Sequence, residues 1–200
     1  MMSAWIFILV TLNAFCDWQA DSITSIRQKN RENQIEIEST VYFKKNKMRV
    51  DTKIPTESSI FIDISAKRAV TAIHAAKVKF ESSLSELKSR IPHCADLSEK
   101  QNIEDCLKKN KFKQIKKETL NGIHCAVYFA KLKDAEVTLW RPLDFKGVPS
   151  VKTIYSSKNG DNVETIFKNI KETQLQEDLF HIPVTYKEAK GLENFFKSFK

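Results

Sequence analysis

Glycine and proline are scarce in this chain, which has 4 Gly and 5 Pro among 200 residues. Their scarcity excludes a collagen-like, linker-rich or low-complexity protein. Hydrophobic residues make up 42% of the chain and charged residues 29%, which is the balance of a globular protein. Without a short leader, the remaining chain has the length of one domain, about 100–200 residues.

Signatures of catalysis are also missing from the sequence. It contains no GxSxG, HExxH, CxxC or glycine-rich phosphate loop. Its four histidines, His74, His93, His124 and His181, lie in separate segments. The sequence therefore predicts a protein that is not an enzyme and uses no cofactor or metal. The alternative is an enzyme whose site assembles only in the folded chain.

The chain lacks an arginine-rich stripe, although its formal net charge is +8. Its lysines occur in ones and twos, as at Lys44-Lys45, Lys108-Lys109 and Lys116-Lys117. No nucleic-acid motif with interleaved aromatic residues is present. We therefore expect a solvated, mildly basic surface and no nucleic-acid partner.

An apolar run occupies residues 4–15. Its length suits the hydrophobic region of a signal peptide, about 7–15 residues, and falls short of the roughly 20 residues that span a bilayer. Cleavage after Cys16 would place the small residues Ala14 and Cys16 at the recognised positions, and cleavage as late as Ala20 is the alternative. The sequence predicts a signal peptide at residues 1–16 and an exported, periplasmic protein. A lipid anchor on Cys16 is less favoured, because the bulky Phe15 precedes it.

Three cysteines follow the predicted leader, at Cys94, Cys106 and Cys125. An oxidising compartment favours one disulfide and one unpaired thiol. Cys94 and Cys106 flank a polar turn-and-helix segment, so they are the candidate disulfide, within a helical insertion at residues 92–110. Cys125 is either a buried thiol or the partner of one of the others. A zinc site built on the two adjacent His-Cys pairs is disfavoured, because neighbouring residues of a strand point to opposite faces.

Alternation of apolar and polar residues dominates the rest of the chain. Asn121-Gly122 between two alternating runs is a strong hairpin signal, and Asn46 supplies a permissive backbone in a turn at residues 44–47. Residues 82–88 have the pattern of a short helix. Because no β-α-β alternation occurs, we predict about ten antiparallel strands in one sheet that curls around its apolar face. The alternating segments are residues 35–43, 48–50, 60–64, 70–73, 78–80, 112–120, 123–129, 136–140, 151–156 and 163–170.

The last residues have a helical pattern instead. Leu192, Phe195, Phe196 and Phe199 are spaced to share one face of an amphipathic helix. We expect a helix at residues 191–200 that packs on the sheet. The alternative is a lid, or a surface that touches lipid.

Four short motifs resemble those of LolA-like periplasmic proteins and occur in the same order. They are the Lys-x-Arg of residues 47–49, the cysteine-containing hairpin of residues 119–128, the tryptophan strand of residues 137–140 and the LFxIPxxYK pattern of residues 179–187. The chain from residue 17 to 190 is thus similar to the LolA-like lipoprotein-carrier superfamily, including its uncharacterised exported bacterial members.

The resemblance implies a curved antiparallel half-barrel with a few short helices over its mouth. In LolA itself the cavity carries acylated lipoproteins. Ile123 stands where the family pattern has an aromatic residue, and neither the 92–110 insertion nor the Phe-rich tail belongs to that pattern. Arg49 is the nearest candidate for the arginine of a lipoprotein carrier.

These observations predict an exported, monomeric, non-enzymatic protein that binds an acyl chain, a lipid or a lipoprotein in a concave sheet, with transient contact to an envelope membrane. Burial of an acyl chain stabilises such a complex by about 0.8 kcal/mol per methylene group. The alternative is an envelope structural or protein–protein interaction module whose own side chains fill the sheet. The candidate cavity-wall residues are Ile35, Ile37, Val41, Phe43, Arg49, Ile62, Val127, Phe129, Leu139 and Trp140.

Overall fold

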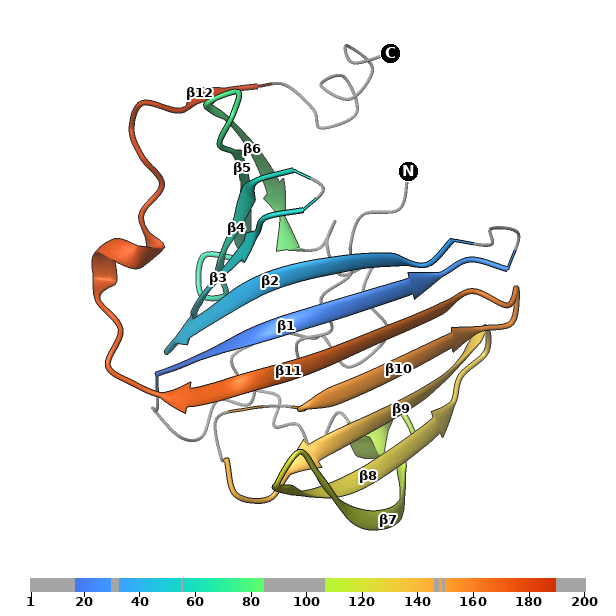
Figure 1. The fold of residues 1–200 in the computed structure, drawn as a ribbon. Helices are drawn as coiled ribbons and strands as arrows, with labels where there is room; N and C mark the ends of the chain where they lie inside the picture. The colour runs from blue at the N-terminus through green and yellow to red at the C-terminus, as the bar shows by residue number, and fades with distance from the viewer. Residues whose placement is uncertain are drawn as a thin grey trace.

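A computed structural model describes residues 17–29, 33–54, 56–84, 107–145, 148 and 150–189, which form one large curved sheet (Figure 1). Its twelve strands follow the order β12-β6-β5-β4-β3-β2-β1-β11-β10-β9-β8-β7. The strands are β1 (Trp18–Arg27), β2 (Ile35–Lys44), β3 (Lys47–Thr52), β4 (Ser58–Asp63), β5 (Arg68–Ile73), β6 (Val78–Ser83), β7 (Lys113–Leu120), β8 (Ile123–Lys131), β9 (Ala135–Pro142), β10 (Lys152–Ser157), β11 (Asn162–Glu172) and β12 (Lys187–Glu188).

The predicted fold class is confirmed, because the chain is mainly β and its sheet is antiparallel apart from the parallel pair β12 and β6. Within the described residues the sheet stays open, since β12 and β7 end it on opposite sides. Helix is limited in the described residues to short pieces such as the 3-10 turn η1 (Glu177–Phe180) and residues 107–109. No helix there is long and apolar enough to cross a membrane.

Tight turns join neighbouring strands. Asn121 (φ 51°) and Gly122 (φ 81°) adopt left-handed backbone between β7 and β8, which confirms the predicted hairpin. Between β2 and β3 the left-handed residue is Lys45 (φ 50°), so the prediction of Asn46 for that role is wrong. Asn46 instead links this turn to the residues that follow β4. Its side-chain amide donates to Ser65 Oγ at 2.9 Å, and its backbone carbonyl accepts from the Ile64 amide at 2.8 Å.

Strand β1 was not among the predicted strands, yet it holds the two halves of the sheet together by pairing with β2 and β11. Its buried positions include Ser22 and Thr24, which an alternation of apolar residues does not reveal. Thr24 is satisfied by a hydroxyl contact of 3.0 Å with Thr165 on β11. A buried hydroxyl needs such a partner, and only the folded sheet supplies it.

Twelve strands replace the predicted ten or so, because β1 and the two-residue β12 were not foreseen. Ser82 and Ser83, expected to begin a helix, instead belong to β6 because they pair with Ala69 and Arg68 of β5. The predicted leader, Cys94 and Cys106, most of the 92–110 insertion and the 191–200 helix lie outside the described residues.

Strand register defines two faces of the sheet, each named here after one residue. The Trp18 face carries a row of cross-strand partners on β1–β5, and the Arg49 face carries the side chains that alternate with it. That row is Trp18, Phe43, Met48, Ile62 and Ala69.

The same register continues through the other half of the sheet. Thr24 pairs with Thr165 on β11, Thr165 with Thr153 on β10, and Thr153 with Leu139 on β9, so all four lie on the Trp18 face. Trp140, next to Leu139, therefore lies on the Arg49 face. Its contact with Lys152, whose ammonium is 5.3 Å from the indole centroid, agrees with that placement.

Candidate functional site

The Trp18 face is the apolar candidate site. Trp18 is 1% exposed, stacks on Phe43 with ring centroids 5.7 Å apart, and meets the edge of Phe167 at 6.3 Å. Neighbouring rows add Val41 and Val50, which are paired across β2 and β3 and are equally buried. Together these residues form a continuous apolar surface across strands distant in sequence.

A band of small hydroxyl residues borders this apolar surface. Ser39 contacts Thr52 through their hydroxyls at 2.9 Å, and Thr24 contacts Thr165 at 3.0 Å. Beyond the band lies a second, smaller apolar cluster, made of Ile26, Ile37 and Val163 with Tyr155 against it. The hydroxyl band therefore divides the face into two apolar zones.

The ten predicted wall residues do not share one face. The strand register places six of them on the Trp18 face, namely Ile35, Ile37, Val41, Phe43, Ile62 and Leu139. The other four, Arg49, Val127, Phe129 and Trp140, lie on the Arg49 face by register. Val127 and Trp140 nevertheless belong to the same buried cluster as Trp18. Leu139 packs under Leu107 in a separate cluster, and Ile35 is 37% exposed at the rim.

Residues 173–189, called the strap here, run from the end of β11 past η1 to β12 (Figure 1). The strap begins beside Asp17, which accepts from the Thr173 amide with its carbonyl at 3.0 Å and from the Leu175 amide with its carboxylate at 3.1 Å. It ends on β6, where the Lys187 amide donates to the Lys77 carbonyl at 2.9 Å.

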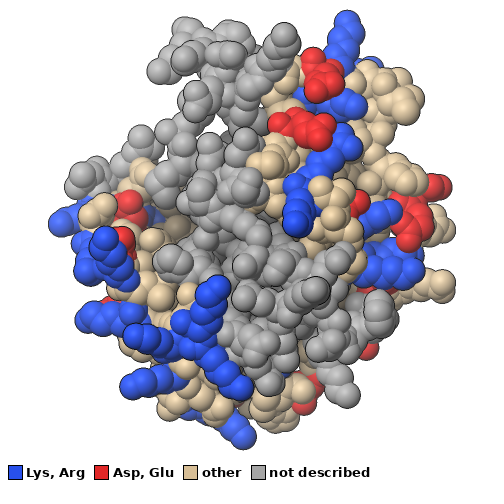
Figure 2. Space-filling model, turned by 180° about the vertical axis from the view of Figure 1, so that it is seen from behind, with Lys and Arg blue, Asp and Glu red and all other residues tan. Residues whose placement is uncertain are grey.

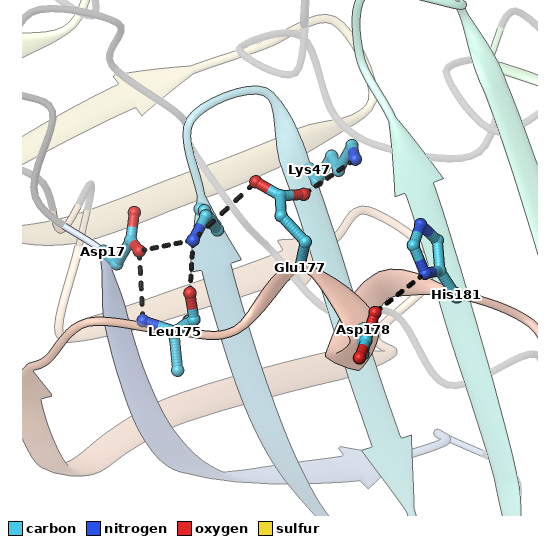
Figure 3. Close-up of polar contacts among 7 residues, drawn as sticks. Asp17, Lys47, Leu175, Glu177, Asp178 and His181 are labelled. Carbon is cyan, nitrogen blue, oxygen red and sulfur yellow. Dashed lines mark hydrogen bonds and ion pairs between the residues drawn. The ribbon is translucent and has the colours of Figure 1, made fainter.

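Lysines of the β2–β3 hairpin hold the first part of the strap (Figure 3). Lys44 Nζ donates to the Leu175 carbonyl and lies 3.4 Å from the Asp17 carboxylate. Lys47 Nζ donates to Glu177 Oε2 at 3.0 Å. The Lys47 hydrogen bond, followed by the charges of Lys47 and Lys44, lowers the pKa of Glu177, which thus stays ionised at neutral pH. Lys44 and residues 174–178 of the strap line a shallow polar groove, not an apolar pocket.

Arg49 is the central anchor of the strap. Its Nη1 donates to the Leu179 carbonyl at 2.8 Å, its Nε donates to Asp51 Oδ1 at 2.7 Å, and its guanidinium lies 5.2 Å from the Phe61 ring centroid. Arg49 therefore binds the strap, and it does so on the face of the sheet opposite Val41 and Phe43. The expectation that it meets a ligand head group beside that wall has no geometric support.

A chain of side-chain hydrogen bonds continues from Asp51 to the strap. Ser59 Oγ lies 2.5 Å from Asp51 Oδ1 and 2.8 Å from His74 Nε2, and His74 Nδ1 lies 2.7 Å from the Tyr186 hydroxyl. An ionised carboxylate only accepts, so Ser59 donates its proton to Asp51 and accepts from His74 Nε2. The hydrogen bond between His74 Nδ1 and the Tyr186 hydroxyl then ties the strap to β4 and to the residue that follows β5.

The Ser59–His74 pair is also where an assembled hydrolase site would be sought. A serine nucleophile must give its proton to the histidine and must reach its substrate. Here the Ser59 proton is directed to Asp51, and Ser59 is 0% exposed. The arrangement suits a structural network that holds the strap.

Cysteine and metal chemistry have little support in the described part of the chain. Cys125 is a free thiol, 1% exposed, and burial raises its pKa, which disfavours the reactive thiolate. No group of three or more His, Cys, Asp or Glu suited to a metal ion occurs among these residues. Burial of Cys125 agrees with the prediction of a buried thiol, and the Cys94–Cys106 disulfide stays a prediction.

Comparisons with known proteins are limited to fold. No protein-family profile matches the sequence, and no curated protein matches it. A LolA superfamily protein from Nitrosomonas europaea is similar in structure, at 12% identity and TM-score 0.46 over 84% of this chain and 91% of that chain. A Vibrio parahaemolyticus domain described as an outer membrane lipoprotein-sorting protein matches at 15% identity and TM-score 0.44, over 88% of this chain and 93% of that chain.

A third similar structure is that of PNGF-II, at 12% identity and TM-score 0.48, over 92% of this chain and 34% of that chain. The first two structures are thus matches of high coverage and low sequence identity to proteins of the kind that the four motifs resemble. At these identities and TM-scores the matches assign neither a ligand nor an activity to this chain.

Proposed function

We propose that this protein is an exported, non-enzymatic binding protein of the carrier type, which holds an acyl chain of a lipid or lipoprotein against the Trp18 face. The observation that carries the proposal is the continuous apolar row across β1–β5 in a sheet that its described strands leave open. Each methylene group buried on such a surface contributes about 0.8 kcal/mol. A single acyl chain thus supplies useful affinity without a polar anchor, and Arg49 is not part of the proposed wall.

The two faces of the sheet allow a direct test by fluorescence. From residue 17 onward the tryptophans are Trp18 and Trp140, one on each face. Trp140→Phe leaves Trp18 as the reporter, and Trp18→Phe leaves Trp140 as the matched control. We expect equimolar dibromostearic acid to quench the Trp18 reporter more strongly than the Trp140 reporter, which lies on the opposite face but in the same buried cluster. Quenching of neither tryptophan, or of both equally, would contradict the proposed site.

A second candidate function is supported by burial. Trp18, Val41, Phe43 and Val50 are between 0% and 4% exposed without any ligand. Complete burial favours an envelope structural or interaction module whose own side chains fill the sheet. Mass spectrometry of the purified protein separates the two, since a carrier retains lipid and a self-filled module does not.

We infer that export removes residues 1–16, because Asp17 contacts the strap and Trp18 is buried in the core. Cleavage after Ala20 would delete Trp18 from the core and Asp17 from its contacts with the strap. We expect the protein secreted to a bacterial periplasm to begin at Asp17, as read by N-terminal sequencing and intact mass. An N-terminus at Asp21 would contradict this inference, and a retained, acylated Cys16 would instead establish the lipid anchor.

A further inference from the structure

The densest positive charge of the described chain lies at one end of the sheet. Residues 108–117 contain six lysines and no Asp or Glu. All six lysines are exposed, and they follow the helical turn at residues 107–109, the left-handed Lys111 (φ 57°) and the first part of β7. Lys and Arg side chains gather at the lower left of Figure 2, with few Asp or Glu among them. We call residues 108–117 the lysine edge.

An apolar side chain projects from the middle of the lysine edge. The β7–β8 register shifts between Gln114 and Lys116, which makes Ile115 the extra residue of a bulge. Ile115 is 55% exposed and has lysines on both sides along the strand. Because β7 ends the strand order, its outer side pairs with no described strand, and the six lysines and Ile115 are exposed there.

We propose that the lysine edge docks on the surface of an anionic lipid bilayer. Lysines attract the phosphates of anionic headgroups, and an exposed isoleucine among them can insert at the boundary between headgroups and acyl chains. This surface is distinct from the Trp18 face, and the inference does not rest on binding of an apolar ligand there.

A nucleic acid fits the lysine edge less well. Single strands bind on exposed aromatic rings, but the one aromatic residue of the edge, Phe112, packs against the cluster of Leu107 and Leu139. The nearest acid, Glu118, does not neutralise the edge as a whole. Glu118 pairs with Lys116 at 2.5 Å and accepts a hydrogen bond from the Trp140 indole. It therefore neutralises one of the six lysines.

Vesicle co-sedimentation tests this proposal with the full exported chain. The edge variant is Lys109→Gln, Lys113→Gln and Lys117→Gln together. The control variant is Lys53→Gln, Lys168→Gln and Lys171→Gln, which removes the same charge at exposed positions elsewhere. Vesicles are phosphatidylglycerol with phosphatidylcholine, or phosphatidylcholine alone. Each lysine near an anionic surface contributes about a five-fold factor to the partition coefficient, so the edge variant should bind about 100-fold more weakly.

We expect the wild type and the control variant to bind phosphatidylglycerol vesicles, and neither to bind phosphatidylcholine alone. Ile115→Gln should weaken binding without changing its dependence on salt, whereas the edge variant, which keeps three of the six lysines, should show a weaker dependence on salt. Circular dichroism shows whether each variant is folded. Equal binding by the edge and control variants, no binding by the wild type, or binding of a DNA or RNA oligonucleotide in preference to vesicles would overturn the proposal. The fluorescence test of the Trp18 face and the vesicle test of the lysine edge use different measurements. The failure of one proposal can therefore be distinguished from the failure of the other.

Discussion

Replacing Trp18 with alanine is expected to lower the free energy of unfolding by about 3–5 kcal/mol, as truncation of a buried aromatic residue does in a core that cannot collapse. Trp18 is 1% exposed, and its indole contacts rings from two other strands, Phe43 and Phe167. Truncation therefore removes contacts that link β1 to both of its neighbours. Because β1 joins the two halves of the sheet, the loss should affect the whole cooperative unit and not one hairpin.

The matched control for this variant is Ile23→Ala on the same strand. Ile23 points to the Arg49 face, where it is half-buried, so its truncation should cost about 1 kcal/mol. Urea unfolding followed by far-UV circular dichroism measures both variants, with the slope m as the check that the transition remains two-state. Equal destabilisation by the two substitutions would mean that the Trp18 face is not the main core of the sheet.

Local signals predicted the hairpins of this fold well. Asn121-Gly122 fixes the β7–β8 turn because both residues accept a left-handed backbone at little cost. The same kind of reasoning failed for β1, whose buried side chains are small or hydroxylic. Ser22 and Thr24 look like surface residues until Ser39 and Thr165 are brought beside them by strands 17 and 141 residues away. Long-range partners of this kind are not visible in a local pattern.

Alternation of apolar and polar residues locates a strand in the sequence, but it does not always show which side chains point to which face of the sheet. Leu139 and Trp140 are consecutive and both are buried, because this strand is covered on its two faces. As neighbours on one strand they must point to opposite faces, but the sequence does not say which of the two shares a face with Val41 and Phe43, and the predicted wall included both. Register with β10 resolves the ambiguity, since Leu139 pairs with Thr153 and Trp140 with Lys152.

Two of the LolA-like motifs prove to be contact partners. The Lys-x-Arg of residues 47–49 and the closing pattern of residues 179–187 meet where Lys47 binds Glu177 just before that pattern and Arg49 binds the Leu179 carbonyl within it. Sequence order alone revealed both motifs but not their contact, which spans 130 residues. Their shared role in this chain is to hold the strap across the Arg49 face.

Replacing Arg49 with alanine is accordingly expected to release the strap and to lower the free energy of unfolding by about 2 kcal/mol. The side chains of Arg49 and Asp51 are 21% and 28% exposed, so their pairing is partly shielded from water. The variant leaves the Leu179 carbonyl without its guanidinium donor, removes a cation beside Asp51 and uncovers Phe61. A hydrogen bond to a charged group contributes about 1.5–3 kcal/mol, and partial exposure reduces that value.

The matched control is Arg68→Ala, which removes an arginine from the same face of the sheet. Arg68 pairs with Glu81, and both side chains are nearly half exposed, so the change should stay within about 0.5 kcal/mol. Hydrogen exchange locates the effect, because the Lys187 and Ala189 amides donate to carbonyls of Lys77 and Lys79 only while the strap is docked. Those two amides should exchange faster in Arg49→Ala and be unchanged in Arg68→Ala. If they remain protected without Arg49, the contacts of Tyr186 with His74 and of Lys44 with Leu175 are sufficient to hold the strap, and Arg49 is not its central anchor.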